Sequence, residues 1–118
     1  MYAARRTCQR DIRLSSVYFE EGSICETIGE FAFIDATNLT EIMLPESISS
    51  IGKSAFNGCS NLKEIYYFGT QEQWQSISKG SYNSALTSAN IYYYSGNPPT
   101  TEGNFWYYDE NGEIVIWS

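Results

Sequence analysis

The sequence of 118 residues predicts a β-rich α/β fold, in which short repeats stack into a solenoid and a β-hairpin closes the C-terminal end. The repeat is visible directly, because residues 28–33 (IGEFAF) return as residues 51–56 (IGKSAF), 23 positions later. A unit of this length cannot bury its apolar face alone and must stack on a neighbour. The hairpin is indicated by Asn111-Gly112, which separates two aromatic and β-branched runs.

Each repeat contains a short run in which apolar and polar residues alternate, as expected of a strand with one buried face. Runs of this kind occupy residues 14–19, 39–44, 62–67 and 89–94. The Ala-Phe segments at 32–33 and 55–56 are too short for a regular helix. They predict one turn of 3₁₀ or α structure on the opposite side of the solenoid.

The repeat pattern changes after Phe68. Thr70 is expected to cap a short helix whose buried face carries Trp74 and Ile77. A Gly/Ser/Asn loop is expected at 79–84. The hairpin strands are predicted at 104–108 and 113–117.

These patterns divide the chain into three parts. Residues 1–13 form an N-terminal extension, either disordered or the remnant of a truncated repeat. Residues 14–68 contain the repeats, and residues 69–118 form a C-terminal capping region with the hairpin.

The net charge of −7 argues against nucleic acid and against an anionic membrane surface, because both attract clusters of Lys and Arg. No apolar run approaches the roughly 20 residues of a membrane span, so membrane insertion is not expected. Arg5 and Arg6 are not followed by the apolar stretch of a signal peptide.

Catalysis and metal binding have little support in the residue types. The chain has no His, no nucleophile motif and no phosphate-binding loop, so neither an enzyme nor a cofactor is expected. Its three Cys are irregularly spaced without a CxxC pair, which argues against a zinc site. Cys59 takes the position that Ala36 holds in the previous repeat, and is therefore expected to be a small buried packing residue.

Residues 51–65 resemble the BspA-like leucine-rich repeats of bacterial surface proteins, whose unit reads roughly I-G-x-x-A-F-x-x-C-x-x-L-x-x-I-x-L-P. Residues 28–45 match the same unit with Ala36 in place of Cys, and residues 66–74 and 106–117 are similar to the closing segment of such chains. The resemblance implies a right-handed leucine-rich-repeat solenoid, located outside the cell or on its surface. Members of the family include adhesins that bind host matrix proteins, and the family has no catalytic signature.

Side chains between the inward positions of the strands are expected to face outward and to form two columns across the sheet. One column contains Tyr18, Met43, Tyr66 and Tyr92, and the other contains Ser16, Glu41, Glu64 and Asn90. An exposed aromatic and Met column is typical of a recognition surface, beside which Glu41 and Glu64 would select a basic protein partner. The alternative is that the column is covered, or stacks only on itself.

The leading hypothesis is therefore a non-catalytic protein-recognition module that adheres to a host or matrix protein. One alternative is a structural C-terminal cap of a longer repeat array. Another is carbohydrate binding through exposed aromatics such as Trp74, Trp106 and Trp117, unless these side chains seal the end of the solenoid. Self-association is expected through the N-terminal edge strand at 14–19, which has no preceding neighbour.

Overall fold

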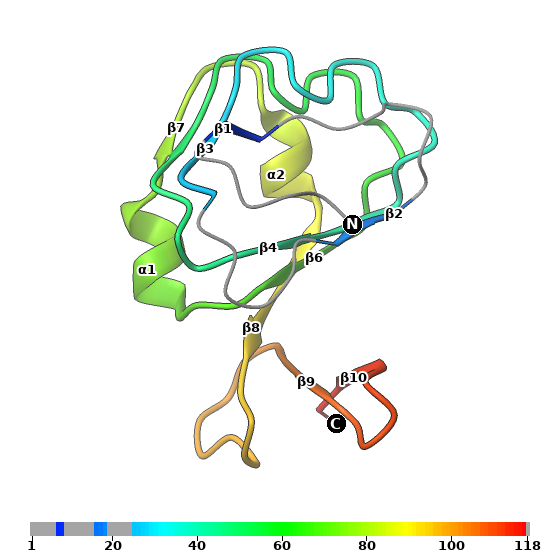
Figure 1. Ribbon diagram of the computed structural model, residues 1–118, viewed down its shortest axis with the longest axis vertical. Helices are drawn as coiled ribbons and strands as arrows, with labels where there is room; N and C mark the ends of the chain where they lie inside the picture. Colours follow the sequence, from blue (N-terminus) through cyan, green and yellow to red (C-terminus); the bar gives the residue numbers. More distant parts are fainter. Residues whose placement is uncertain (1–6, 9–15, 19–24, 118) are drawn as a thin grey trace.

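The computed structural model describes residues 7–8, 16–18 and 25–117, which form two sheets and two short helices (Figure 1). The larger sheet contains β2 (Ser16–Tyr18), β4 (Glu41–Leu44), β6 (Glu64–Tyr67), β8 (Asn90–Tyr94), β9 (Phe105–Tyr108) and β10 (Ile114–Ile116). The smaller sheet contains β1 (Thr7–Cys8), β3 (Thr27–Ile28), β5 (Ser50–Ile51) and β7 (Ser78–Lys79). The helices are α1 (Gln71–Ser76) and α2 (Ser84–Ser88). The fold is thus rich in β-structure with few helices, and its larger sheet curls into a half-barrel.

The strands of the larger sheet follow the predicted repeat. β2, β4, β6 and β8 pair in parallel, so that Ile42 lies opposite Ile65 and Ile65 opposite Ile91. The predicted alternating runs are therefore confirmed as strands, although β4, β6 and β8 are shorter than their runs. Residues 14, 15 and 19 of the first run lie outside the described part of the chain.

The inward side chains of both sheets form one core with the turns between them. Ile42, Leu44 and Ile65 are buried in it. Phe33 and Phe56, which are equivalent in the repeat, stack with ring centroids 5.2 Å apart. Cys59 is buried among them with a free thiol, which confirms its predicted packing role. Cys25 is also buried and is disulfide-bonded.

The Ala-Phe segments form consecutive tight turns instead of the predicted turn of helix. The amide of Ala32 donates to the Gly29 carbonyl at 3.2 Å, while that of Phe33 donates to the Ala55 carbonyl of the next coil at 2.7 Å. This second bond holds the coils so close that a Cβ on Gly52 would lie 2.6 Å from the backbone nitrogen of Glu30. A glycine is needed here because the backbones touch.

Residues 80–83 of the segment predicted as a loop contain neither helix nor strand, as expected, but the segment belongs to a further coil of the repeat, which was not predicted. β7 pairs with β5 in parallel. A Cβ on Gly80 would lie 2.5 Å from the backbone nitrogen of Lys53, so Gly80 approaches Lys53 in the same way as Gly52 approaches Glu30. Tyr82 repeats the left-handed backbone of Ser54, with φ of 64° and 58°. An insertion that includes α1 separates this coil from the previous one, so the coil does not recur at the repeat spacing seen in the sequence.

The C-terminal region has the predicted helix and hairpin. Thr70 caps α1 in a reciprocal arrangement, in which its hydroxyl accepts from the Gln73 amide and the Gln73 side chain accepts from the Thr70 amide. β9 and β10 are antiparallel, with Trp106 opposite Ile116. The hairpin follows β8 in the larger sheet and forms the end of that sheet opposite to β2 (Figure 1).

Candidate functional site

The predicted column of outward side chains exists, but it is largely covered. Met43 lies opposite Tyr66, and Tyr66 lies opposite Tyr92, as expected. Met43 is only 1% exposed and Tyr66 only 7%, so the prediction that they form an open surface is wrong for these two residues. Tyr92 is partly exposed. The backbone of Tyr18 is in register with Met43, but its side chain lies outside the described part of the chain.

The cover is the C-terminal hairpin. Trp106 of β9 is completely buried, with its ring edge-on to Tyr66 at 6.0 Å and to Phe68 at 4.9 Å. The Tyr108 hydroxyl donates to the Met43 sulfur at 3.3 Å. This burial, with help from the negative charges of Glu41 and Glu64, raises the pKa of Tyr66 to about 12. A second small core thus occupies the outer side of the sheet.

The acidic column remains partly open beside this second core. Glu41 lies directly opposite Glu64 on the neighbouring strand, and Glu64 lies opposite Asn90. Partial burial raises the pKa of Glu41, and the charge of Glu64 raises it further. The two carboxylates therefore form a like-charged pair on a rigid parallel sheet, which favours a cationic contact over an anionic one.

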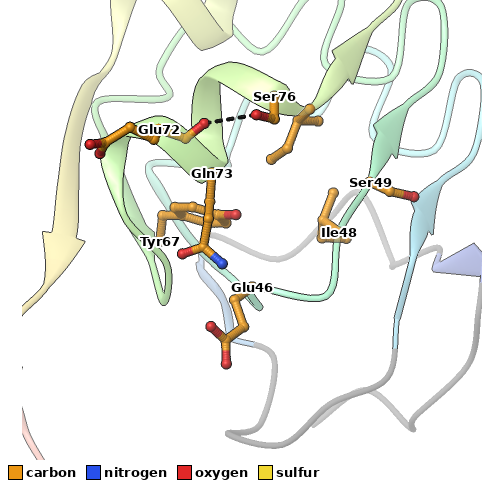
Figure 2. Close-up of a pocket in the computed structure, with 8 residues that line it drawn as sticks. Glu46, Ile48, Ser49, Tyr67, Glu72, Gln73 and Ser76 are labelled. Atoms are coloured by element: carbon orange, nitrogen blue, oxygen red, sulfur yellow. Dashed lines mark hydrogen bonds between the residues drawn. The ribbon is translucent and has the colours of Figure 1, made fainter.

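A shallow hollow of about 310 Å³ lies between α1 and the segment after β4 (Figure 2). Its lining residues are Glu46, Ile48, Ser49, Tyr67, Glu72, Gln73, Ser76 and Ile77. Burial raises the pKa of the Tyr67 phenol, and Glu46 raises it further. In Figure 2 the carboxylate of Glu72 points away from Ile48 and Glu46.

A larger cleft of about 630 Å³ lies between α1, β8 and the segment that leads into β9; we call it the α1–β8 cleft. Its lining residues are Thr70, Gln71, Glu72, Ile91, Tyr93, Tyr94, Thr101, Glu102, Gly103, Asn104 and Phe105. The sequence analysis did not identify this cleft. The aromatic residues 92–94, which point alternately to the two sides of the strand, were the sequence signal for one wall of the cleft. No pattern in residues 101–105 predicted that this segment would fold back beside the strand.

The three Trp side chains mostly close the fold. Trp74 and Trp106 are buried, which supports the sealing role and leaves neither ring open to a sugar. Trp117 is partly exposed, packs on Tyr107 at 4.1 Å, and donates through its indole N–H to the Ser95 carbonyl. Lys79 completes the seal, because its ammonium donates to the Trp74 and Ile77 carbonyls at the end of α1.

Within the described part of the chain, no group of three or more His, Cys, Asp or Glu side chains is placed to hold a metal ion. No helix in residues 7–8, 16–18 and 25–117 has the length and apolar content needed to cross a bilayer.

Comparison with known proteins identifies the repeat. Residues 5–108 match a family model described as the BspA type leucine rich repeat region (6 copies). A solved leucine rich cell surface protein from Faecalibacterium prausnitzii A2-165 matches with 37% identity and a TM-score of 0.52, over 57% of this chain and 17% of that chain. No curated protein matches the chain. The match over most of the sequence shows that this chain belongs to the BspA-type leucine-rich repeat family.

Proposed function

We propose that this chain is a non-catalytic protein-recognition module of a surface protein, which adheres to a basic region of a host or matrix protein. The observation that carries the proposal is the pairing of Glu41 with Glu64 on a parallel sheet. Two negative charges directly opposite one another present an acidic point on the sheet, which favours a cationic partner.

The distribution of charge supports the same partner. The chain has 14 Asp and Glu against 7 Lys and Arg, and one of these cations, Lys79, is engaged at the end of α1. A surface with this excess of negative charge attracts positively charged proteins and accelerates their association. It disfavours nucleic acids and other polyanions.

A surface location is consistent with the relatives and with the cysteine chemistry. The solved neighbour is described as a cell surface protein. Cys25 is disulfide-bonded, and structural disulfides persist mainly in oxidising environments outside the cytosol.

A second candidate function is supported by the asymmetry between the ends of the fold: this chain would be the closing unit of a longer repeat array. Among the described residues, β1 and β2 are the edge strands of the two sheets, and both carry open parallel pairing positions on the same side. The opposite side ends differently: β9 pairs in parallel with β8, β10 then returns antiparallel to β9, and Lys79 binds the carbonyls at the end of α1. Terminal units of solenoids are sealed in this manner, and recognition and capping are compatible roles.

Binding to immobilised matrix proteins and glycans, followed by biolayer interferometry, tests the proposed recognition. We expect binding to a basic protein whose association rate falls several-fold in Glu64→Lys, with the difference shrinking at high salt. Glu30→Lys is the matched control, because Glu30 is an exposed carboxylate in the turn after β3 and not on the sheet face. Equal effects of the two substitutions, or binding to glycans alone, would refute recognition through Glu41 and Glu64.

A further inference from the structure

We propose that the α1–β8 cleft binds the cationic side chain, lysine or arginine, of a protein segment. This inference rests on the proposed role in protein recognition and assigns it a second, more enclosed contact point. The cleft volume of about 630 Å³ lies within the range of small-molecule and side-chain sites.

Aromatic rings form part of the wall. Tyr93 on β8 lies opposite Phe105 on β9, so both rings are presented from paired strands. Neighbouring rings hold Tyr93 and Tyr94 in place: Tyr93 meets Tyr67 edge-on at 6.4 Å, and Tyr94 meets Trp106 edge-on at 5.0 Å. Fixed aromatic faces attract ammonium and guanidinium groups within about 6 Å of the ring centre.

Two carboxylates contribute to the same lining. Glu72 comes from the first turn of α1, and Glu102 comes from the segment before β9. Among the described residues that line the cleft there is no Lys or Arg to offset these two charges. Carboxylates beside aromatic faces are the combination that favours a cationic side chain, whereas an anionic ligand would be repelled.

Gly103 allows the segment before β9 to run close to the aromatic wall. Its φ of 144° is a conformation that other residues rarely adopt, and an added Cβ would lie 3.1 Å from the Phe105 ring. The segment therefore stays close to Phe105, which keeps Glu102 beside the aromatic wall. Thr70, Gln71 and Asn104 supply polar groups that can hydrogen-bond to the peptide carrying the cation.

Titration of the folded chain with short peptides, followed by amide NMR shifts, tests the inference. The probes are tetralysine, tetraarginine, a tetrapeptide of Nε-acetyl-lysine as the neutral match, and N-acetylchitotriose as the glycan. We expect the two cationic peptides to shift the amides of residues 101–105 and 93–94. The acetylated peptide should cause no comparable shift.

Charge-removing variants separate the cleft from the overall charge of the protein. Glu102→Gln should weaken tetralysine binding by about fivefold or more, since one of the two carboxylates in the lining is lost. Glu30→Gln, which removes the same charge from a distant turn, should change it by less than about twofold. Phe105→Leu should weaken binding while a retained melting temperature shows that the fold is intact.

Three results would overturn the cleft as a cation site: equal weakening by Glu102→Gln and Glu30→Gln, shifts confined to Glu41 and Glu64, or shifts at 101–105 caused only by chitotriose. Failure of the proposed recognition function has a different signature. In that case the peptides would bind in the cleft, while no matrix protein would bind and Glu64→Lys would have no effect.

Discussion

The indole N–H of Trp106 donates a hydrogen bond of 3.0 Å to the backbone carbonyl of Tyr67, across 39 positions of the sequence. Both partners are buried, and the bond fixes β9 against the outer side of β6. It explains why Met43 and Tyr66, which alternate away from the main core, are nevertheless covered. Without the hairpin, Met43 and Tyr66 would be exposed on the sheet. Under the hairpin they form a second core.

Loss of this bond should be costly. In Trp106→Phe the ring is largely replaced but the donor is lost, leaving the Tyr67 carbonyl buried without this partner. We expect the free energy of unfolding to fall by about 1–3 kcal/mol, measured by urea denaturation. Trp117→Phe is the matched control, because its indole bond to Ser95 is only partly buried and should cost less. A larger loss in Trp117→Phe would contradict the account of the hairpin.

Asn83 should stabilise the last coil as Phe56 stabilises the middle coil. Its side chain accepts from the Phe56 amide at 2.9 Å and donates to the Gly52 and Gly80 carbonyls, both at 3.0 Å. Asn83→Ala removes partners from several backbone groups and should destabilise the protein by about 3 kcal/mol or more. Asn97→Ala, at an exposed turn, should change stability by less than about 0.5 kcal/mol. Similar values for the two variants would show that the side chain of Asn83 does not hold the coils together.

These cases show what could and could not be predicted from sequence. The repeat of 28–33 in 51–56 predicted the parallel register, because equivalent residues of stacked coils must lie side by side. The coil at 78–83 was missed because Lys79 and Asn83 replace the expected Ile and Ala, and polar side chains give no apolar period. The cover over Met43 and Tyr66 was missed because it depends on how the sheet curls after β8, which no local pattern encodes. The α1–β8 cleft was missed for the same reason.

Cys59 should be inert as long as the protein is folded. Its thiol donates to the Phe33 carbonyl, and burial raises its pKa to about 11. Alkylation by iodoacetamide at pH 8 should therefore be negligible before unfolding. Because the folded-state pKa is above the ordinary value of 9.0, this group favours folding below pH 9, and that contribution is lost as the pH rises towards 11.

Substitution should separate packing from reactivity at the same position. Cys59→Ala should cost about 1 kcal/mol, because Ala36 already occupies the equivalent site in the previous coil. Phe56→Ala should cost about 3–5 kcal/mol, because it removes a fully buried ring stacked on Phe33. Rapid alkylation of native protein, or equal costs for the two variants, would assign Cys59 a role beyond packing.

The Glu41–Glu64 pair should make the stability of the protein depend on pH. The pKa of Glu41 is raised, so its contribution to stability is present when it is protonated at low pH and is lost as the pH rises through its folded-state pKa. Glu41→Gln should therefore stabilise the protein by a few tenths of a kcal/mol at pH 7 and give no benefit near pH 3. Thermal denaturation at both pH values measures this, with Glu30→Gln as the control. A loss of stability in Glu41→Gln at pH 7 would show that the carboxylate is held for structural reasons.

Oxidation of Met43 tests most directly whether the hairpin covers the outer side of the sheet. Met43 is 1% exposed and accepts from the Tyr108 hydroxyl, so hydrogen peroxide should convert it to the sulfoxide far more slowly in the folded protein than in urea-unfolded protein. Peptide mass spectrometry over a time course measures both rates, and Trp106→Phe should accelerate the reaction in the folded state by loosening the cover. If Met43 of the native protein is oxidised as fast as in the unfolded chain, the hairpin does not lie over Met43 and Tyr66, and these residues return to the candidate binding surface.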